Sequence, residues 1–208
     1  YDLSLISAEA SKRIGVNDDM IASQCLSSIY QALSGLSSLI SNDVTSGMNI
    51  FYGYSNENTL SSSLTGYDSN FLDNILQRLK ITAPSFIENS LIFGAVKIDA
   101  PYASPSKGVA YRNGLCGQSQ TPQPVLNLFL KKLTSKGILH HSCATTYDIN
   151  NGAAGLSTRL HIPALYFGCP IYSLHSIREM AFEEDLQAFS NAVNSFFEWN
   201  KYVFITVT

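Results

Sequence analysis

The stretch PALYFGCPIYSLHSIREMAFEEDLQAFSNAVNSFFEW (163–199) places a strand pattern, a histidine and a helix pattern in direct succession. Residues 163–170 are apolar and β-rich, which is typical of a buried strand. Residues 182–199 carry three acids in their first turn, as helix N-termini favour. Their apolar side chains fall on one helical face: Phe182, Leu186, Phe189, Val193 and Phe196. A buried strand followed by an amphipathic helix, with His175 between them, predicts an α/β protein.

The rest of the chain alternates between the same two kinds of pattern. Strand patterns cover residues 1–7, 48–54, 90–100, 138–146 and 201–208, and helical patterns cover residues 18–40, 68–79 and 121–137. For the first helix we expect Asp18 or Asp19 as the N-cap and a core-facing apolar row. That row consists of Ile21, Cys25, Ile29, Leu33, Leu36 and Ile40. The predicted fold is a three-layer α/β/α sandwich with a mixed central sheet and helices on both faces.

Length and composition narrow the class of protein. The chain has 208 residues, 45% hydrophobic composition and a net charge of −3, which fits one compact domain. No basic cluster follows a phosphate backbone, and no run of 18 apolar residues spans a membrane, so neither nucleic acid nor a membrane is an expected partner. Four scattered cysteines without CxxC spacing favour reduced thiols and a cytoplasmic location. The start at Tyr1, without methionine, suggests a fragment or a processed chain.

Polar residues follow three of the predicted strands. Glu57 lies after the strand at 48–54, Asp99 at the end of the strand at 90–100, and His175 after the strand at 163–170. In open α/β sheets, ligands bind at the carboxyl ends of strands. Two carboxylates and an imidazole at one sheet edge are the residues expected for zinc-dependent hydrolysis.

The motif LHSIREM (174–180), followed by a helix that ends in SFFEW (195–199), strongly resembles the close of the M18 (aspartyl/vacuolar-type) zinc aminopeptidases. YSNENTLS (54–61) and KIDAPYA (97–103) resemble two further motifs of that family. The resemblance covers roughly residues 1–199 and implies the later part of a zinc-aminopeptidase catalytic domain. Residues 200–208 would then form a C-terminal strand or tail.

The resemblance assigns family roles to some residues of this chain, whereas at other positions the family's residue is replaced. It makes Glu57 the general base, and Asp99 and His175 metal ligands. Other positions have changed: a ligand glutamate is Asn58, the metal-bridging aspartate aligns with Ser27 or Ser28, and an expected histidine is Tyr102. The family's first metal-binding histidine and its inserted dimerisation domain have no counterpart in this sequence. Two-metal hydrolases need a shared carboxylate between their cations, so Asp99 and His175 are expected to be vestigial ligands, with zinc weak or absent.

The leading hypothesis is therefore a diverged, non-catalytic M18-like protein that is retained for assembly or binding. The alternative is an active zinc aminopeptidase that removes N-terminal acidic residues from peptides, with ligands supplied by another chain. The resemblance also implies a homo-oligomer or a second chain that completes the fold, and peptides as further partners.

Simpler interpretations remain open for each residue. His175 can be held by packing and a hydrogen bond, Glu57 can be a solvated loop acid, and Asp99 can cap the turn that follows it. A different class of enzyme would use Cys116 as a nucleophile with His140 or His141 as its base. Those two histidines point to opposite faces of a strand, so they do not easily share one metal.

Overall fold

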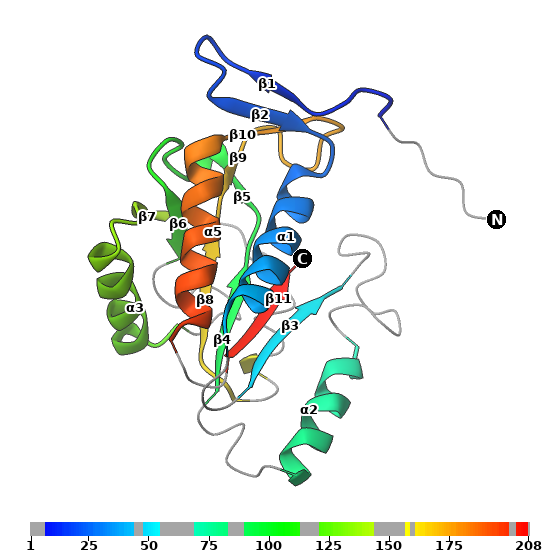
Figure 1. Cartoon of the computed structure of the whole chain (residues 1–208), viewed down its shortest axis with the longest axis vertical. Coiled ribbons are helices and arrows are strands. Elements are labelled where there is room, and N and C mark those ends of the chain that lie inside the picture. Colours follow the sequence, from blue (N-terminus) through cyan, green and yellow to red (C-terminus); the bar gives the residue numbers. More distant parts are fainter. Residues whose placement is uncertain are drawn as a thin grey trace, which may run out of the picture.

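The computed structural model describes residues 7–43, 48–54, 69–82, 90–112, 121–143, 157–158, 161–199 and 203–207. Its centre is a six-stranded sheet with the order β3-β11-β4-β8-β6-β7 (Figure 1). These strands are β3 (Asn49–Gly53), β11 (Val203–Val207), β4 (Leu91–Ala95), β8 (Ala164–Gly168), β6 (Val109–Arg112) and β7 (His140–Cys143). Neighbouring strands run parallel except β6 and β8, which are antiparallel. The expected mixed sheet is confirmed.

Helices cover both faces of this sheet. Three helices share a core with the side chains on one face of β4 and β8: α1 (Leu26–Ser41), α3 (Gln123–Ser135) and α5 (Glu183–Phe197). Helix α2 (Phe71–Thr82) packs against the opposite face, where Leu72 and Leu76 join a second core with Ile92 and Tyr166. The predicted α/β/α sandwich is therefore confirmed.

Aromatic rings fill the first core. Phe93 on β4 is fully buried and lies 5.1 Å from Phe196, 5.4 Å from Phe167 and 6.3 Å from Phe129, measured between ring centroids. Large rings bury much apolar area and favour offset-stacked or edge-on contacts, and both kinds occur among these pairs. The helix face predicted from residues 182–199 is thus the face that packs on the sheet.

Two small sheets extend this sandwich. Strand β5 (Ile98–Asp99) pairs in parallel with β9 (Pro170–Ile171), beyond the ends of β4 and β8. The strand predicted at 90–100 is therefore broken into β4 and β5. Strands β1 (Lys12–Ile14) and β10 (Glu179–Phe182) flank β2 (Met20–Ser23) in an antiparallel sheet.

The start predicted for the first helix is wrong. Met20–Ser23 forms β2, and α1 begins only at Leu26, with Cys25 at its N-cap in the left-handed conformation. Residues 20–23 find a partner in β10, which lies about 160 positions later in the sequence. Such a distant partner overrides the local helical spacing.

The orientation predicted for α1 is also wrong. Ile29, Leu33, Leu36 and Ile40 are exposed, whereas small and polar residues are buried: Ser27, Gln31, Ser34, Gly35 and Ser38. The small side chains let α1 lie close to α5, and the Gln31 side-chain amide donates to the Val96 carbonyl over 3.0 Å. In helix α2, Leu72 and Leu76 are buried, while Phe71 and Ile75 are exposed.

Three further predictions concern the helix at 121–137 and the strands at 1–7 and 201–208. Helix α3 ends as predicted: Gly137 has a φ of 68°, and the Ile138 amide donates to the Leu133 carbonyl over 3.0 Å. Its N-cap is Pro122, so the helix begins at Gln123, two residues inside the predicted range 121–137. The pattern at 201–208 forms β11, while the pattern at 1–7 lies almost entirely outside the described residues. Among the described helices, none is long and apolar enough to cross a membrane.

Candidate functional site

His175 lies in a tight loop between β9 and β10. Tyr172 and Met180 close this loop with two backbone hydrogen bonds of 2.8 and 3.1 Å. Ser173 and His175 both have left-handed backbone angles, with φ values of 54° and 62°. Non-glycine residues seldom adopt this region, and those that do cluster at functional sites. The histidine is exposed, at a loop between two strands and not at the strand-helix junction predicted for it.

A buried carboxylate, that of Glu179, organises this loop. Glu179 on β10 is 2% exposed, and one of its oxygens accepts the His175 backbone amide over 2.9 Å. It also accepts the Ser27 amide over 2.7 Å and the Ser27 hydroxyl over 3.1 Å. Ser27 is the second residue of α1, so the carboxylate satisfies a free amide at a positive helix end.

Glu179 is the residue that sequence reasoning missed. It lies inside the motif LHSIREM, and its position among apolar residues of a short strand was the available signal. Ser27 stands at one of the two positions expected for a metal-bridging aspartate. Here the Ser27 hydroxyl and amide are both bonded to Glu179, so the negative charge at this place comes from β10.

Asp99 is half-buried and directly precedes a short 3-10 helix, Ala100–Tyr102. It occupies the N-cap position, but its side chain makes no capping hydrogen bond. The second residue of that helix is Pro101, which has no amide to donate. The prediction that the Asp99 side chain caps this turn is therefore wrong.

Asp99 and His175 do come to the same edge of the fold. Strands β5 and β9 are parallel, Asp99 pairs with Ile171, and His175 follows Ile171 by four residues. Asp99 thus ends β5, and His175 follows the adjacent parallel strand β9. Across the residues the structure describes, no group of three or more His, Cys, Asp and Glu side chains is placed to hold a metal ion. Glu57 and Asn58 lie outside the described residues.

Within the described ranges, the predicted ligands Asp99 and His175 do not by themselves fit a two-zinc site. Zinc takes three or four N, O or S ligands, and a pair of zinc ions needs a bridging carboxylate. Asp99 and His175 offer one donor group each, and serine at the bridging position is neutral. No hydrolytic step can be derived from these residues alone.

A second buried carboxylate holds the loop that follows Asp99. Asp185, fully buried in the first turn of α5, accepts the Ser106 amide over 2.8 Å and the Gly108 amide over 2.7 Å. Burial is the largest influence on the Asp185 pKa and raises it, although both amide hydrogen bonds act to lower it. This loop carries Tyr102, so Asp185 and Glu179 fix the two segments that bear Asp99 and His175.

The histidines of the cysteine-nucleophile alternative are both engaged. The His141 Nε2 accepts the Ser104 amide over 3.0 Å, and its Nδ1 lies 3.3 Å from the Lys107 carbonyl. The His140 Nδ1 lies 2.9 Å from the Ile138 carbonyl. These contacts orient the two rings, and Cys116 lies outside the described residues, so the cysteine-nucleophile alternative stays untested. Of the described cysteines, Cys25, Cys143 and Cys169 are unpaired.

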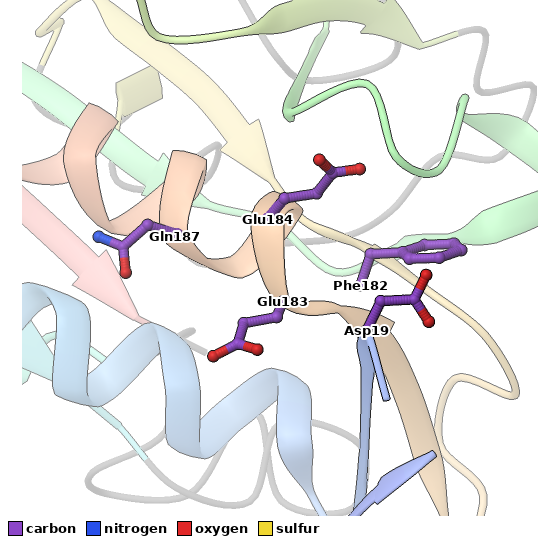
Figure 2. Close-up of a pocket in the computed structure, with 5 residues that line it drawn as sticks. All are labelled: Asp19, Phe182, Glu183, Glu184 and Gln187. Carbon is purple, nitrogen blue, oxygen red and sulfur yellow. The ribbon is translucent and has the colours of Figure 1, made fainter. Parts of the chain in front are cut away.

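A surface hollow of about 440 Å³ lies at the N-terminus of α5, lined by Asp19, Phe182, Glu183, Glu184 and Gln187. Figure 2 shows Asp19 beside Phe182, with Glu183 and Glu184 pointing to different sides of the helix. Glu183 is paired with Arg13 over 2.5 Å, and Glu184 accepts the Ser106 hydroxyl. Glu183 is therefore charge-paired and Glu184 is hydrogen-bonded, and neither Asp99 nor His175 is among the described residues that line this hollow.

Comparison with known proteins supports the resemblance found in the sequence. The model of the aminopeptidase I zinc metalloprotease family (M18) matches residues 1–99. The Clostridium novyi protein named "Probable M18 family aminopeptidase 2" is 28% identical over 209 residues, which cover 89% of this chain and 48% of that protein. This chain thus spans about half the length of the curated relatives it matches.

Solved structures share the fold. The M18 family aminopeptidase of Thermotoga maritima superposes with a TM-score of 0.69 at 16% identity, over 92% of this chain and 49% of that one. The mApe1 dodecamer of S. cerevisiae gives a TM-score of 0.70 at 17% identity, over 93% of this chain and 49% of that one. At these identities the likeness concerns the fold alone.

Proposed function

Since this chain is a diverged relative of the M18 aminopeptidases, we propose that it no longer hydrolyses peptides by itself and is retained for assembly or binding. The observation that carries the proposal is Ser27, whose amide and hydroxyl are bonded to Glu179 where the resemblance expects a bridging carboxylate. Asp99 and His175 are then remnants of a metal site whose charge balance has been lost.

The reason to expect weak zinc binding is electrostatic. Two divalent cations held close together repel each other, and anionic ligands offset that repulsion. Serine at position 27 and asparagine at position 58 are both neutral. Losing even an outer partner of a metal ligand typically costs about 10 to 100-fold in affinity, and losing ligands costs more. Zinc binding by this chain is therefore expected to be weak or absent.

The alternative function is an active zinc aminopeptidase with Glu57 as the general base. It is favoured by one observation: Asp99 and His175 leave adjacent parallel strands at the same edge. Ligands from another chain would have to complete that site. The substrates would be peptides with acidic N-terminal residues, as the resemblance implies.

Assembly is the part of the proposal that relatives support. The S. cerevisiae structure that shares this fold is a dodecamer. We expect this chain to form a homo-oligomer or to bind a second chain that completes the fold. Unpaired Cys25, Cys143 and Cys169 favour a reducing location, the cytoplasm.

Metal content and turnover test the two functions. The purified full chain is loaded with zinc and desalted, and its zinc is measured per protomer. Release of a chromophore from an N-terminal aspartyl substrate is then followed for the chain, for Glu57→Gln and for Asp99→Asn/His175→Ala. We expect less than stoichiometric zinc and equal background rates for all three. Two zinc ions per protomer, or turnover that disappears in Glu57→Gln, would overturn the proposal.

A further inference from the structure

The outer face of α1 carries an uncovered row of large aliphatic side chains. Ile29, Leu33, Leu36 and Ile40 expose 52%, 56%, 45% and 75% of their surface. Their spacing of four, three and four residues keeps them in one line along the helix, about 16 Å long. Exposed apolar side chains are ordinary when they are scattered singly, but these four lie in one unbroken row, which suits contact with another helix.

The helix cannot turn this row inward, because its opposite face is already fixed. Gln31 donates to the Val96 carbonyl over 3.0 Å, and Ser27 is bonded to Glu179. At the far end, the Asn42 side-chain amide donates to the Asn194 side chain on α5 over 2.7 Å. The aliphatic row is therefore a fixed feature of the folded surface.

The row reads identically in both directions. The order is isoleucine, leucine, leucine, isoleucine, and the spacing of four, three and four is symmetric about a point midway between residues 34 and 35. A two-fold axis at that point would place Ile29 on Ile40 of a second copy and Leu33 on its Leu36. Two-fold interfaces are self-complementary in this way: the same patch meets itself.

The small residues beside the aliphatic row and the lack of charged side chains on α1 suit the same two-fold arrangement. The same axis exchanges Ala32 and Ser37, whose small side chains let two helices approach closely. Residues 26–41 contain no Asp, Glu, Lys or Arg, so no charge is buried or repelled in such a contact. An antiparallel pair also sets the positive end of one helix beside the negative end of the other.

We propose that α1 is a homodimer interface, in which the α1 helices of two copies pack antiparallel through Ile29, Leu33, Leu36 and Ile40. This inference rests on the assembly role proposed above and names its surface. A fully buried leucine or isoleucine removes on the order of 100 Å² of apolar surface. Four half-exposed side chains give roughly 200 Å² per copy, below a standard interface. We therefore expect the dimer to be weak and reversible.

The first test measures mass against concentration. Sedimentation of the full chain from about 5 to about 500 µM is expected to move from the 22.8 kDa monomer towards twice that mass. Leu33→Glu should weaken dimerisation at least about tenfold, because it places a carboxylate in the centre of the apolar contact. Leu128→Glu is the matched control: Leu128 is an exposed leucine on α3, away from the row. Both variants change exposed residues, so their unfolding midpoints should match that of the parent chain.

The second test determines whether the two α1 helices pair in antiparallel or parallel orientation. In a Cys25→Ser background, copies with Ile29→Cys are mixed with copies with Ile40→Cys and mildly oxidised. Antiparallel pairing joins residue 29 to residue 40, so a disulfide dimer should form in the mixture. Neither protein alone should cross-link between introduced cysteines, because like positions are about 16 Å apart along the helix axis. A parallel pair would give the reverse pattern.

The inference is overturned by a chain that stays monomeric at all concentrations, or by a multimer that Leu33→Glu leaves intact. Cross-links in the single-variant samples, or another polypeptide bound to the row in place of a second copy, overturn it as well. None of these readouts depends on zinc or turnover. Loss of the α1 contact would leave the proposed non-catalytic role standing, and zinc-dependent turnover would leave the dimer standing.

Discussion

At the scale of single residues, buried carboxylates order the segments that carry Asp99 and His175. Glu179 joins β10, α1 and the His175 loop, and Asp185 joins α5 to the loop after Asp99. Each carboxylate accepts only backbone amides and hydroxyls in the contacts described above. Charge-assisted hydrogen bonds of this kind are stronger than neutral ones, which is why these acids tolerate burial.

Glu179→Gln should destabilise the fold by about 1.5–3 kcal/mol, because the amide keeps one acceptor oxygen and turns an NH2 group towards donors. Urea unfolding of the full chain measures the loss. Glu183→Gln is the control, since Glu183 forms an exposed ion pair with Arg13, and its midpoint should hardly move. Equal effects in the two variants would mean that the Glu179 network is not a stabilising feature.

Asp185 should make stability depend on pH. Burial raises its folded pKa above the unfolded value of about 3.9, so the folded state holds the proton more tightly. Its stabilising contribution is complete below the unfolded pKa and is lost as pH rises through the folded pKa. The charge of nearby Glu184 raises this pKa and His141 lowers it. The stability of the parent chain relative to Asp185→Asn should therefore fall as pH rises through that window, then level off. Urea unfolding at stepped pH measures it, and a constant difference would contradict the assignment.

At the scale of helices, strands and their connections, two glycines have left-handed backbones, but adding a side chain at each should cost a different amount of stability. Gly108 has a φ of 82°, and an added Cβ would lie 2.1 Å from the Leu139 carbonyl oxygen. Gly137, at the end of α3, has a φ of 68° and open space around the Cβ position. The first position combines backbone strain with a collision, whereas the second has backbone strain alone.

Gly137→Ala should cost about 1 kcal/mol, the usual penalty for a left-handed alanine. Gly108→Ala should cost more than about 3 kcal/mol, because the β6–β7 contact must also open. Thermal and urea unfolding of both variants give the comparison. If the two losses were equal, the close approach of Leu139 to Gly108 would be wrong.

At the scale of the whole molecule, the last strand holds the sheet together. Strand β11 is paired on one side with β3 and on the other with β4, although it is the end of the sequence described. This arrangement makes the predicted division between residues 1–199 and 200–208 directly testable.

Ending the chain after residue 199 should remove β3's described partner and lower stability by more than about 3 kcal/mol, or cause aggregation through the exposed edges. Ile205→Pro should act in the same direction, since proline cannot donate within a central strand. Ile205→Val, which keeps the backbone amide, serves as the control. Unchanged cooperative unfolding of the shortened chain would show that residues 1–199 fold independently.

Sequence patterns predicted the α/β class and the strand-end positions of Asp99 and His175. Both features depend on residues that are close together along the chain. The buried strand at 163–170, the amphipathic helix at 182–199 and the placement of Asp99 and His175 at strand ends all follow from periodicity and position. Strand β10 was not predicted, because its four residues form a strand only when β2 lies beside them. The role of Glu179 depends on Ser27, about 150 positions away, and could not be seen locally.

The sequence by itself determined that α1 is a helix with one aliphatic row, because residues three and four apart share a face whatever surrounds them. Only the tertiary structure decided that this row points outward, since small residues on the other face pack more closely against α5. The same division holds for the site. Residue identity placed an acid and a histidine at strand ends, and long-range hydrogen bonds decided that Ser27 meets Glu179. Periodicity is a local property, whereas the choice of partner depends on packing between distant segments.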